Sequence, residues 1–282
     1  MVENHRWLDV LAHLTLILGV VIVAFPVYIA VVASTHEPAD FVSGLIPLLP
    51  GDNAVATYAS VLEGGVSSQM SVPILTMLKN SLIMAVLIAV GKIVISVLSA
   101  YAIVYFRFPF RQLAFWMIFV TLMLPVEVRI VPTFQVVADL GMLNSYAGLT
   151  IPLIASATAT FLFRQVFLTI PDELMEAARI DGAGPMKFFR DILLPLSRTN
   201  IAALFVILFI YGWNQYLWPI LITTDAGFYT IVAGIKRMAD VVDSEPLWNY
   251  IMATAVLAML PPVIVVIAMQ RLFVKGLVET EK

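Results

Sequence analysis

The chain has 282 residues, of which 61% are hydrophobic and only 12% are charged, and its formal net charge is −3. Soluble domains carry charge on about a quarter of their residues, so this composition indicates a protein that crosses a membrane several times. The negative charge argues against a nucleic-acid partner, and the absence of cysteine excludes disulfides and thiolate chemistry. The scattered histidines His5, His13 and His36 do not form a metal-binding pattern.

Six apolar stretches are long enough to cross a bilayer as helices, because about 20 helical residues span its hydrocarbon core. They are Leu11–Ala33, Ser81–Tyr105, Leu113–Ile130, Tyr146–Phe163, Ile201–Ile222 and Tyr250–Met269. The first stretch is about twice as long as the apolar region of a signal peptide, so we expect it to be retained as a span. The sequence therefore predicts an all-α membrane protein with six transmembrane helices.

The distribution of Lys and Arg predicts the orientation of these spans. With the N-terminus inside, eleven Lys or Arg residues fall on the inner side and four on the outer side, and Lys92 lies within the second span. Most acidic loop residues then lie outside. We therefore expect both termini to be cytoplasmic.

The longest polar interruption, residues 171–195, falls on the inner side between the fourth and fifth spans. Pro171 suits the start of a helix, and Gly182 suits the left-handed residue that ends one. A second short helix is expected from Gly184-Pro185 to Pro195. This pattern predicts a helix–turn–helix on the inner membrane surface, and an amphipathic loop that only rests on lipid headgroups is the alternative.

The interruption contains Glu-Ala-Ala from Glu176, then Gly182 after three residues, then Ile-x-Leu-Pro ending at Pro195 after nine more. This EAA-x3-G-x9-I-x-L-P spacing resembles the cytoplasmic coupling motif of permeases from bacterial ABC importers. The stretches MLPVEVRIVPTF (123–134), FLFRQVFLTIPDEL (161–174) and GWNQYLWPIL (212–221) are similar to the second permease of carbohydrate-type, maltose-like importers. Within that group, PVEVRI and FIYGWNQYLWP look like permeases for sn-glycerol-3-phosphate.

The resemblance covers nearly the whole chain and implies the type I importer (MetI-like) permease fold. It divides the chain into an N-terminal helix with an outer segment (1–78), a permease core (79–270) with coupling helices at 171–195, and a cytoplasmic tail (271–282). The implied coupling residues, which would seat in a groove of an ATPase subunit, are Glu176, Ala177, Ala178, Arg179, Asp181, Gly182 and Pro195. In the tail, Lys275 and Gly276 would make a secondary contact with the same subunit.

The resemblance also implies the partners and the cellular location. The expected complex in the bacterial inner (cytoplasmic) membrane contains a second, different permease, a homodimeric ATP-binding subunit and a periplasmic substrate-binding protein. The chain has no Gly-rich GxxxxGK[ST] loop, so ATP and Mg²⁺ are expected in the partner, with no cofactor and no catalytic site here. The expected cargo is sn-glycerol-3-phosphate or a glycerophosphodiester, and a neutral sugar or oligosaccharide is the alternative. A secondary carrier is less favoured, since Lys92 is the only charge at mid-span.

Three places are candidates for lining the substrate pathway. Lys92 in the second span is either held by an internal hydrogen bond or ion pair, or it offers a positive site to an anionic substrate. Arg129 near the outer end of the third span, close to Glu127, either anchors to lipid phosphate or guides a phosphate-bearing substrate. The third place is the polar-aromatic cluster Trp213, Asn214, Gln215 and Tyr216, whose two amides we expect to be buried and to need partners, unless its rings only form an interfacial belt. The loop that follows, 223–235, would meet the substrate-binding protein.

Overall fold

The computed structural model describes residues 6–42, 44, 47–64, 72–123, 125–240 and 245–278, with only the backbone at 6, 8, 121–123, 126, 127 and 271–278. Throughout these ranges every regular element is helical, as the sequence predicts. The chain forms two compact units. One comprises Met1–Leu75 and Gly234–Leu260, and the other comprises Thr76–Ala233 and Pro261–Lys282.

The first unit contains α1 (Arg6–Ala33), η1 (Pro38–Phe41), α2 (Ala54–Glu63) and the beginning of α14 (Trp248–Val278). Large apolar side chains along α1, including Leu11, Leu18 and Val23, are more than half exposed. A water-soluble protein rarely leaves such a continuous apolar surface uncovered. Helix α1 therefore has the surface of a helix that faces lipid or another apolar partner.

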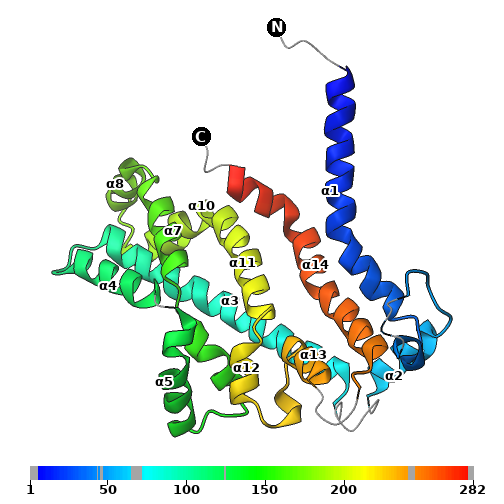
Figure 1. Ribbon diagram of the computed structural model, residues 1–282. Helices are drawn as coiled ribbons and strands as arrows, with labels where there is room; N and C mark the ends of the chain where they lie inside the picture. Colours follow the sequence, from blue (N-terminus) through cyan, green and yellow to red (C-terminus); the bar gives the residue numbers. More distant parts are fainter. Residues whose placement is uncertain are drawn as a thin grey trace. The chain divides into compact units, whose positions relative to one another are not determined.

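The second unit is built around the long helix α3 (Ile74–Tyr105), which runs the length of this unit in Figure 1. Its other elements, in chain order, are α4 (Arg111–Met123), α5 (Val126–Asp139), α6 (Tyr146–Thr150), η2 (Ile151–Leu153), α7 (Ala157–Leu168), α8 (Asp172–Ile180), α9 (Pro185–Phe188), η3 (Phe189–Leu193), α10 (Leu194–Leu196), α11 (Arg198–Trp213), α12 (Leu217–Ile222) and η4 (Ala226–Phe228). Helix α13 (Ile231–Ala239) crosses the boundary between the units. Figure 1 shows α8 at one end of the second unit, with α5 and α12 at the other end.

A buried cluster joins α3 to the short helices at the end of the unit opposite α8. It consists of Met84, Ile88, Val137, Leu149, Trp218 and Ile222. Trp218 is nearly inaccessible, and its indole Nε1 donates a hydrogen bond to the Gly148 carbonyl at 3.0 Å. Helix α11 also lies very close to α3, because a Cβ on Gly212 would come within 2.9 Å of the Ala85 Cα. Small residues at such contacts let membrane helices approach closely.

Three helical stretches are long and apolar enough to cross a membrane, Asp9–Ala33, Ile74–Tyr105 and Trp248–Gln270. They correspond to the first, second and sixth predicted spans. Two bent pairs, Tyr146–Leu153 with Ala157–Leu168 and Pro185–Leu196 with Arg198–Trp213, have angles of 52° and 71°. Counting each pair as one span gives up to five among the described residues, so the count of six and the orientation of the termini stay predictions.

The other three predicted spans are not continuous helices, which corrects the sequence-based expectation. Pro125, with φ −53° and ψ 142°, separates α4 from α5 inside the stretch 113–130. Ser156 starts α7 anew inside 146–163, where its hydroxyl accepts from the Ala159 N–H. Residues Asn214–Tyr216 separate α11 from α12 inside 201–222. Hydropathy measures only apolar content, and such breaks are tolerated at membrane depth where other protein segments satisfy the freed backbone groups.

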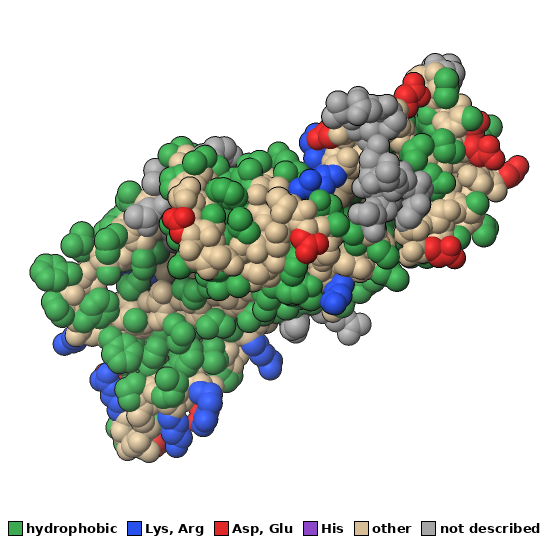
Figure 2. Space-filling view, turned by 90° about the horizontal axis from the view of Figure 1, so that it is seen from below, with side chains coloured by type: hydrophobic (Ala, Val, Ile, Leu, Met, Phe, Trp, Pro, Cys, Tyr) green, Lys and Arg blue, Asp and Glu red, His purple; other side chains and the backbone are tan. Residues whose placement is uncertain are grey.

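Hydrophobic side chains cover much of the face seen in Figure 2, with Lys, Arg, Asp and Glu confined to small groups. On α3, the apolar side chains of Leu87, Val94 and Leu98 are exposed. The surface composition thus matches a protein whose solvent is largely lipid.

Candidate functional site

The helix α8 lies inside the predicted coupling segment, and its two ends are well defined. Pro171 precedes its first residue, and Asp172 and Glu173 occupy the first turn, where negative charge is favourable. At the other end Gly182 has φ +72°. The Ala183 N–H donates to the Ala178 carbonyl at 2.8 Å, and the Gly182 N–H donates to the Arg179 carbonyl at 3.0 Å. These two bonds form a Schellman motif, so the predicted left-handed stop at Gly182 is confirmed.

The predicted coupling residues of α8 divide between two faces. Glu176 and Ala177 are exposed, together with Ile180, whose exposed fraction is 86%. Ala178 is instead buried at 5% exposure, and it lines a cavity within this chain together with Arg179. Exposed Glu173 lies one turn before Glu176 and Ala177, so the outward face offers two carboxylates and a small apolar surface, while Ala178 packs within the chain.

The rest of the coupling segment fastens α8 to the end of α3. Phe188 and Phe189 are buried, and their rings lie 5.3 Å from Tyr105 and 4.8 Å from Tyr101, respectively. The Tyr101 hydroxyl donates to the Pro185 carbonyl at 2.8 Å. Two aromatic pairs and a hydrogen bond thus hold this segment against the end of α3.

The sequence predicts that the second short helix ends at Pro195, but this residue lies within α10 and the helical run continues past it. The turn before it, η3, is wound as a π-helix, and the run ends only at Ser197, before α11. Proline has no N–H to donate to the carbonyl four residues earlier, which accounts for irregular winding here. Asp181 is exposed as the C-cap residue of α8.

Lys92 lies in the middle of α3 and is 7% exposed. Its ammonium Nζ lies 3.8 Å from the centre of the Tyr211 ring on α11, a cation–π contact. The Arg129 side chain is half-buried and close enough for its charge to act electrostatically on both Lys92 and Tyr211. No carboxylate pairs with Lys92 within the part of the chain that the structure describes.

The cluster 213–216 is divided by the break between α11 and α12. Trp213 is buried at 2% exposure and stacks on Phe209 with ring centres 5.8 Å apart, so it belongs to the core. Asn214 is exposed, Gln215 is half-buried and Tyr216 is exposed. The expectation of two buried amides is therefore wrong for Asn214, because α11 ends at Trp213 and Asn214 becomes its C-cap residue. The Gln215 Nε2 donates to the carbonyl of Tyr211 at 3.2 Å, and Tyr211 is the residue whose ring Lys92 contacts.

The loop after α12 is held by two asparagines that the sequence analysis did not single out. The Asn144 side-chain oxygen accepts from the N–H groups of Thr224 and Asp225 at 2.7 and 2.9 Å. Buried Asn80 donates to the carbonyls of Gly227 and Tyr229 at 2.8 and 3.0 Å. Nothing local in the sequence marks these partners, which are about 80 and 150 residues apart along the chain.

Three further predicted residues fall at the edge of what is described. Lys275 and Gly276 lie near the end of α14, where the structure describes only the backbone, and the Glu127 side chain also lies outside the described residues. Among the residues that the structure describes, no group of three or more His, Asp or Glu side chains is placed to hold a metal ion.

The second unit thus combines apolar helices, a buried lysine at Lys92 and a polar helix–turn–helix at one end. The chain belongs to the family of binding-protein-dependent transport system inner membrane components, whose model matches residues 92–279. The resemblance predicted from the EAA-x3-G spacing is thereby confirmed.

Individual relatives match over the full length of the chain. It is 63% identical over 282 residues to the sn-glycerol-3-phosphate transport system permease protein UgpE of Agrobacterium fabrum, with 100% of both chains covered. The permeases of the same description from Rhizobium meliloti and Yersinia pestis are 59% and 58% identical, again over 100% of both chains.

Solved structures with the same fold come from alginate transport. A bacterial ABC transporter involved in the import of the acidic polysaccharide alginate contains a chain with a TM-score of 0.79 and 21% identity, covering 96% of this chain and 98% of that one. A second structure, of a bacterial alginate ABC transporter in complex with an alginate-pentasaccharide-bound periplasmic protein, gives a TM-score of 0.62 at 16% identity, covering 94% and 92%. At these identities the likeness concerns the fold alone.

Proposed function

We propose that this chain is a permease subunit of an ATP-driven importer for sn-glycerol-3-phosphate or related glycerophosphodiesters in the bacterial inner membrane. The observation that carries the proposal is the 63% identity to a UgpE permease over every residue of the chain. Its expected partners are a second permease, a homodimeric ATP-binding subunit that holds ATP and Mg²⁺, and a periplasmic substrate-binding protein.

The interior cations support an anionic cargo. Burying an ammonium at the centre of a membrane costs roughly 2.5–3.5 kcal/mol on insertion scales, whereas a cation–π contact contributes only about 0.5–2 kcal/mol. The contact between Lys92 and Tyr211 therefore does not fully offset the cost of placing this charge there. A phosphate passing between Lys92 and Arg129 supplies the missing negative charge, which a neutral sugar does not.

The contacts of α8 support a mechanical link to the ATP-binding subunit. When ATP draws the partner subunits together, the outward face of α8 moves with the groove that holds it. The aromatic contacts of Phe188 and Phe189 transmit this motion to the end of α3. Lys92 lies 13 residues before Tyr105 on the same helix, about 20 Å along its axis at 1.5 Å per residue. Movement of α3 thus changes the access of Lys92 to either side of the membrane.

The test of this role is charge reversal on the outward face of α8. Glu176→Lys should abolish uptake and weaken co-purification of the ATP-binding subunit, because a basic side chain repels the basic group expected in the groove. The chain should still reach the membrane, since Glu176 is exposed.

Asp191→Lys is the matched control, because Asp191 is an exposed acid of the same segment that pairs with Arg190 at 2.7 Å. This variant should retain uptake. Normal uptake and normal association of the ATP-binding subunit in Glu176→Lys would reject the coupling role.

A further inference from the structure

A cavity of about 1010 Å³ lies between the end of α3, the turn that follows it and the inner face of α8. The Tyr101 and Tyr105 side chains form one wall, and Met175 and Ala178 of α8 form another. Its volume is at the upper end of the range for small-molecule sites. The proposed coupling role uses the opposite, outward face of α8 and leaves this cavity unexplained.

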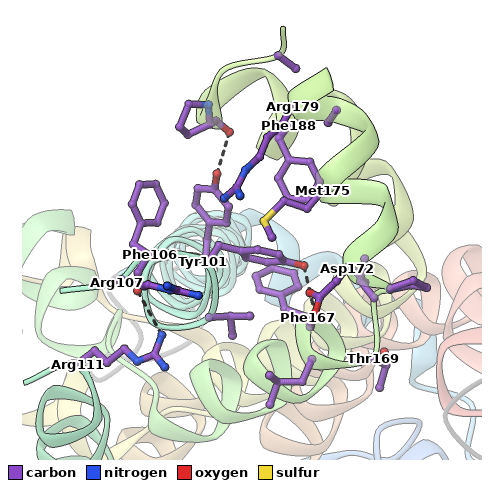
Figure 3. A pocket seen from close by; sticks show the side chains of 18 residues that line it. Tyr101, Phe106, Arg107, Arg111, Phe167, Thr169, Asp172, Met175, Arg179 and Phe188 are labelled. Carbon is purple, nitrogen blue, oxygen red and sulfur yellow. Dashed lines mark hydrogen bonds between the residues drawn. The ribbon is translucent and has the colours of Figure 1, made fainter. Parts of the chain in front are cut away.

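The charges that line the cavity are unbalanced. Arg107, Arg111 and Arg179 contribute three guanidinium groups, and Asp172 is the single carboxylate of the lining. Figure 3 shows Arg107 and Arg179 reaching toward the same space from different sides, with Asp172 on the side of α8.

The three guanidinium groups keep most of their donors free. Within the described ranges no carboxylate pairs with any of them. Among the described residues, their one hydrogen bond runs from Arg111 Nη1 to the Phe106 carbonyl, at 3.5 Å. Since each guanidinium carries five N–H donors arranged to match phosphate oxygens, the cavity is suited to a phosphate group.

The rim of the cavity is apolar and exposed. Phe106 lines the cavity and is exposed, and the exposed rings of Phe108 and Phe110 follow it on the same turn between α3 and α4. Phe110 has φ +61°, a left-handed conformation that is unfavourable for a bulky residue. No burial of its ring offsets this cost, because its side chain is exposed. Leu168 on the opposite side is 53% exposed. Exposed apolar side chains of this kind favour contact with lipid hydrocarbon over contact with water.

We propose that this cavity binds the phosphate of an anionic phospholipid, with the acyl chains lying against the exposed Phe106–Phe110 turn. A free phosphate ion would use the arginines but would leave the aromatic rim without a partner, so the rim favours the lipid. Basic pockets beside transmembrane helices on the inner side of the membrane are a recognised form of headgroup site.

A lipid held here would touch both α8 and the end of α3, the two elements that are proposed to move together. Its phosphate would contact Arg107 and Arg111 on the α3–α4 turn and Arg179 on α8. The bound lipid would therefore restrain the motion of α8 relative to α3. This consequence rests on the proposed coupling function, whereas the binding itself does not.

The test is native mass spectrometry of the full-length protein, purified with its associated subunits and titrated with phosphatidylglycerol or phosphatidylcholine. The wild type should retain phosphatidylglycerol in preference to phosphatidylcholine. The Arg107→Gln/Arg111→Gln pair should weaken phosphatidylglycerol binding roughly tenfold or more, since each basic residue near a membrane surface contributes about 1 kcal/mol. Arg107→Lys/Arg111→Lys should recover most of the binding, and Asp172→Asn should strengthen it by removing the only opposing charge.

Arg198→Gln is the control, because Arg198 is exposed at the start of α11 and does not line the cavity. It should leave lipid binding within about twofold of wild type. Equal retention of both lipids, or unchanged binding in the double Gln variant, would overturn the proposal. Displacement of the lipid by millimolar inorganic phosphate would also overturn it in favour of a soluble anion. Because the readout is lipid binding, a chain that binds the lipid but does not transport would contradict the proposed function alone.

Discussion

Gly182 is the residue on which the shape of the coupling segment most directly depends. Its φ of +72° is costly for residues with a Cβ, although a Cβ there would meet no neighbouring atom. Gly182→Ala should therefore destabilise the end of α8 by about 1 kcal/mol through backbone strain alone. Limited proteolysis of the 181–185 turn should become faster, and coupled uptake should fall.

Gly184→Ala provides the comparison within the same turn. Gly184 has φ −72° and likewise has open space around its Cβ position. Alanine at this position should leave proteolysis and uptake unchanged. Equal behaviour of the two variants would show that the left-handed stop does not matter.

Lys92 and Arg129 are the residues expected to sense the charge of the cargo. Lys92→Gln and Arg129→Gln should each raise the apparent KM for sn-glycerol-3-phosphate about tenfold or more, because a charge-assisted hydrogen bond contributes roughly 1.5–3 kcal/mol. Assembly of the complex should be unaffected. Lys79→Gln, an exposed lysine on the same helix, should transport normally. Unchanged uptake kinetics in both pathway variants would reject their role.

The sequence predicted single residues well where the signal was local. The stop at Gly182 was predicted from local residues alone, because a helix end is decided within a few residues, whereas the coupling role of Glu176 stays a prediction. The exposure of Asn214 and the burial of Ala178 were not predictable in this way, since the first depends on where α11 ends and the second on the segment that packs against α8. The contact of Tyr211 with Lys92 joins α11 to α3 and has no local signal at all.

Helix α3 is the element that connects the sites. It carries Asn80 near one end, Lys92 in the middle and Tyr101 and Tyr105 at the other end. The sequence predicted this helix because it is long, apolar and uninterrupted. It did not predict the divisions at Pro125, Ser156 and Asn214, because proline and polar residues also occur inside intact membrane helices.

The turn after α1 contains a pair of titrating groups. The Nε2 atom of His36 contacts the Leu49 carbonyl, and its Nδ1 atom contacts the Asp40 carboxylate. Both partners can only accept hydrogen bonds, so the ring must donate from both nitrogens, as only imidazolium does. The hydrogen bond to Leu49, followed by that to Asp40, raises the pKa of His36 above its ordinary 6.5. The hydrogen bond from His36 lowers the pKa of Asp40 below its ordinary 3.8.

These opposite shifts predict a window of stability for this turn. The stability that His36 contributes is complete below pH 6.5 and is lost as the pH rises through its raised pKa. The stability that Asp40 contributes is complete above pH 3.8 and is lost as the pH falls through its lowered pKa. Hydrogen exchange around His36, corrected for intrinsic rates, should show greater protection at pH 6 than at pH 8. His36→Gln should remove this difference. Equal protection of the wild type at both pH values would contradict the assignment of imidazolium.

At the scale of the whole molecule, the proposed function assigns the energy source to a partner subunit that meets the exposed face of α8. The interior cations point to a negatively charged cargo. Membrane class and family were predictable from the sequence, because composition and the coupling spacing are properties of the chain itself. Selectivity among phosphate esters was not predictable from this sequence, because no motif in it has a defined ligand chemistry.

The most direct test of the account is uptake by the complete complex in proteoliposomes, with ATP on the side of α8 and labelled sn-glycerol-3-phosphate delivered by the binding protein on the other. Accumulation that requires hydrolysable ATP, and that is lost in Glu176→Lys but retained in Asp191→Lys, is the predicted result. Accumulation driven by an ion gradient without ATP, or ATP-driven accumulation that Glu176→Lys leaves intact, would contradict the account.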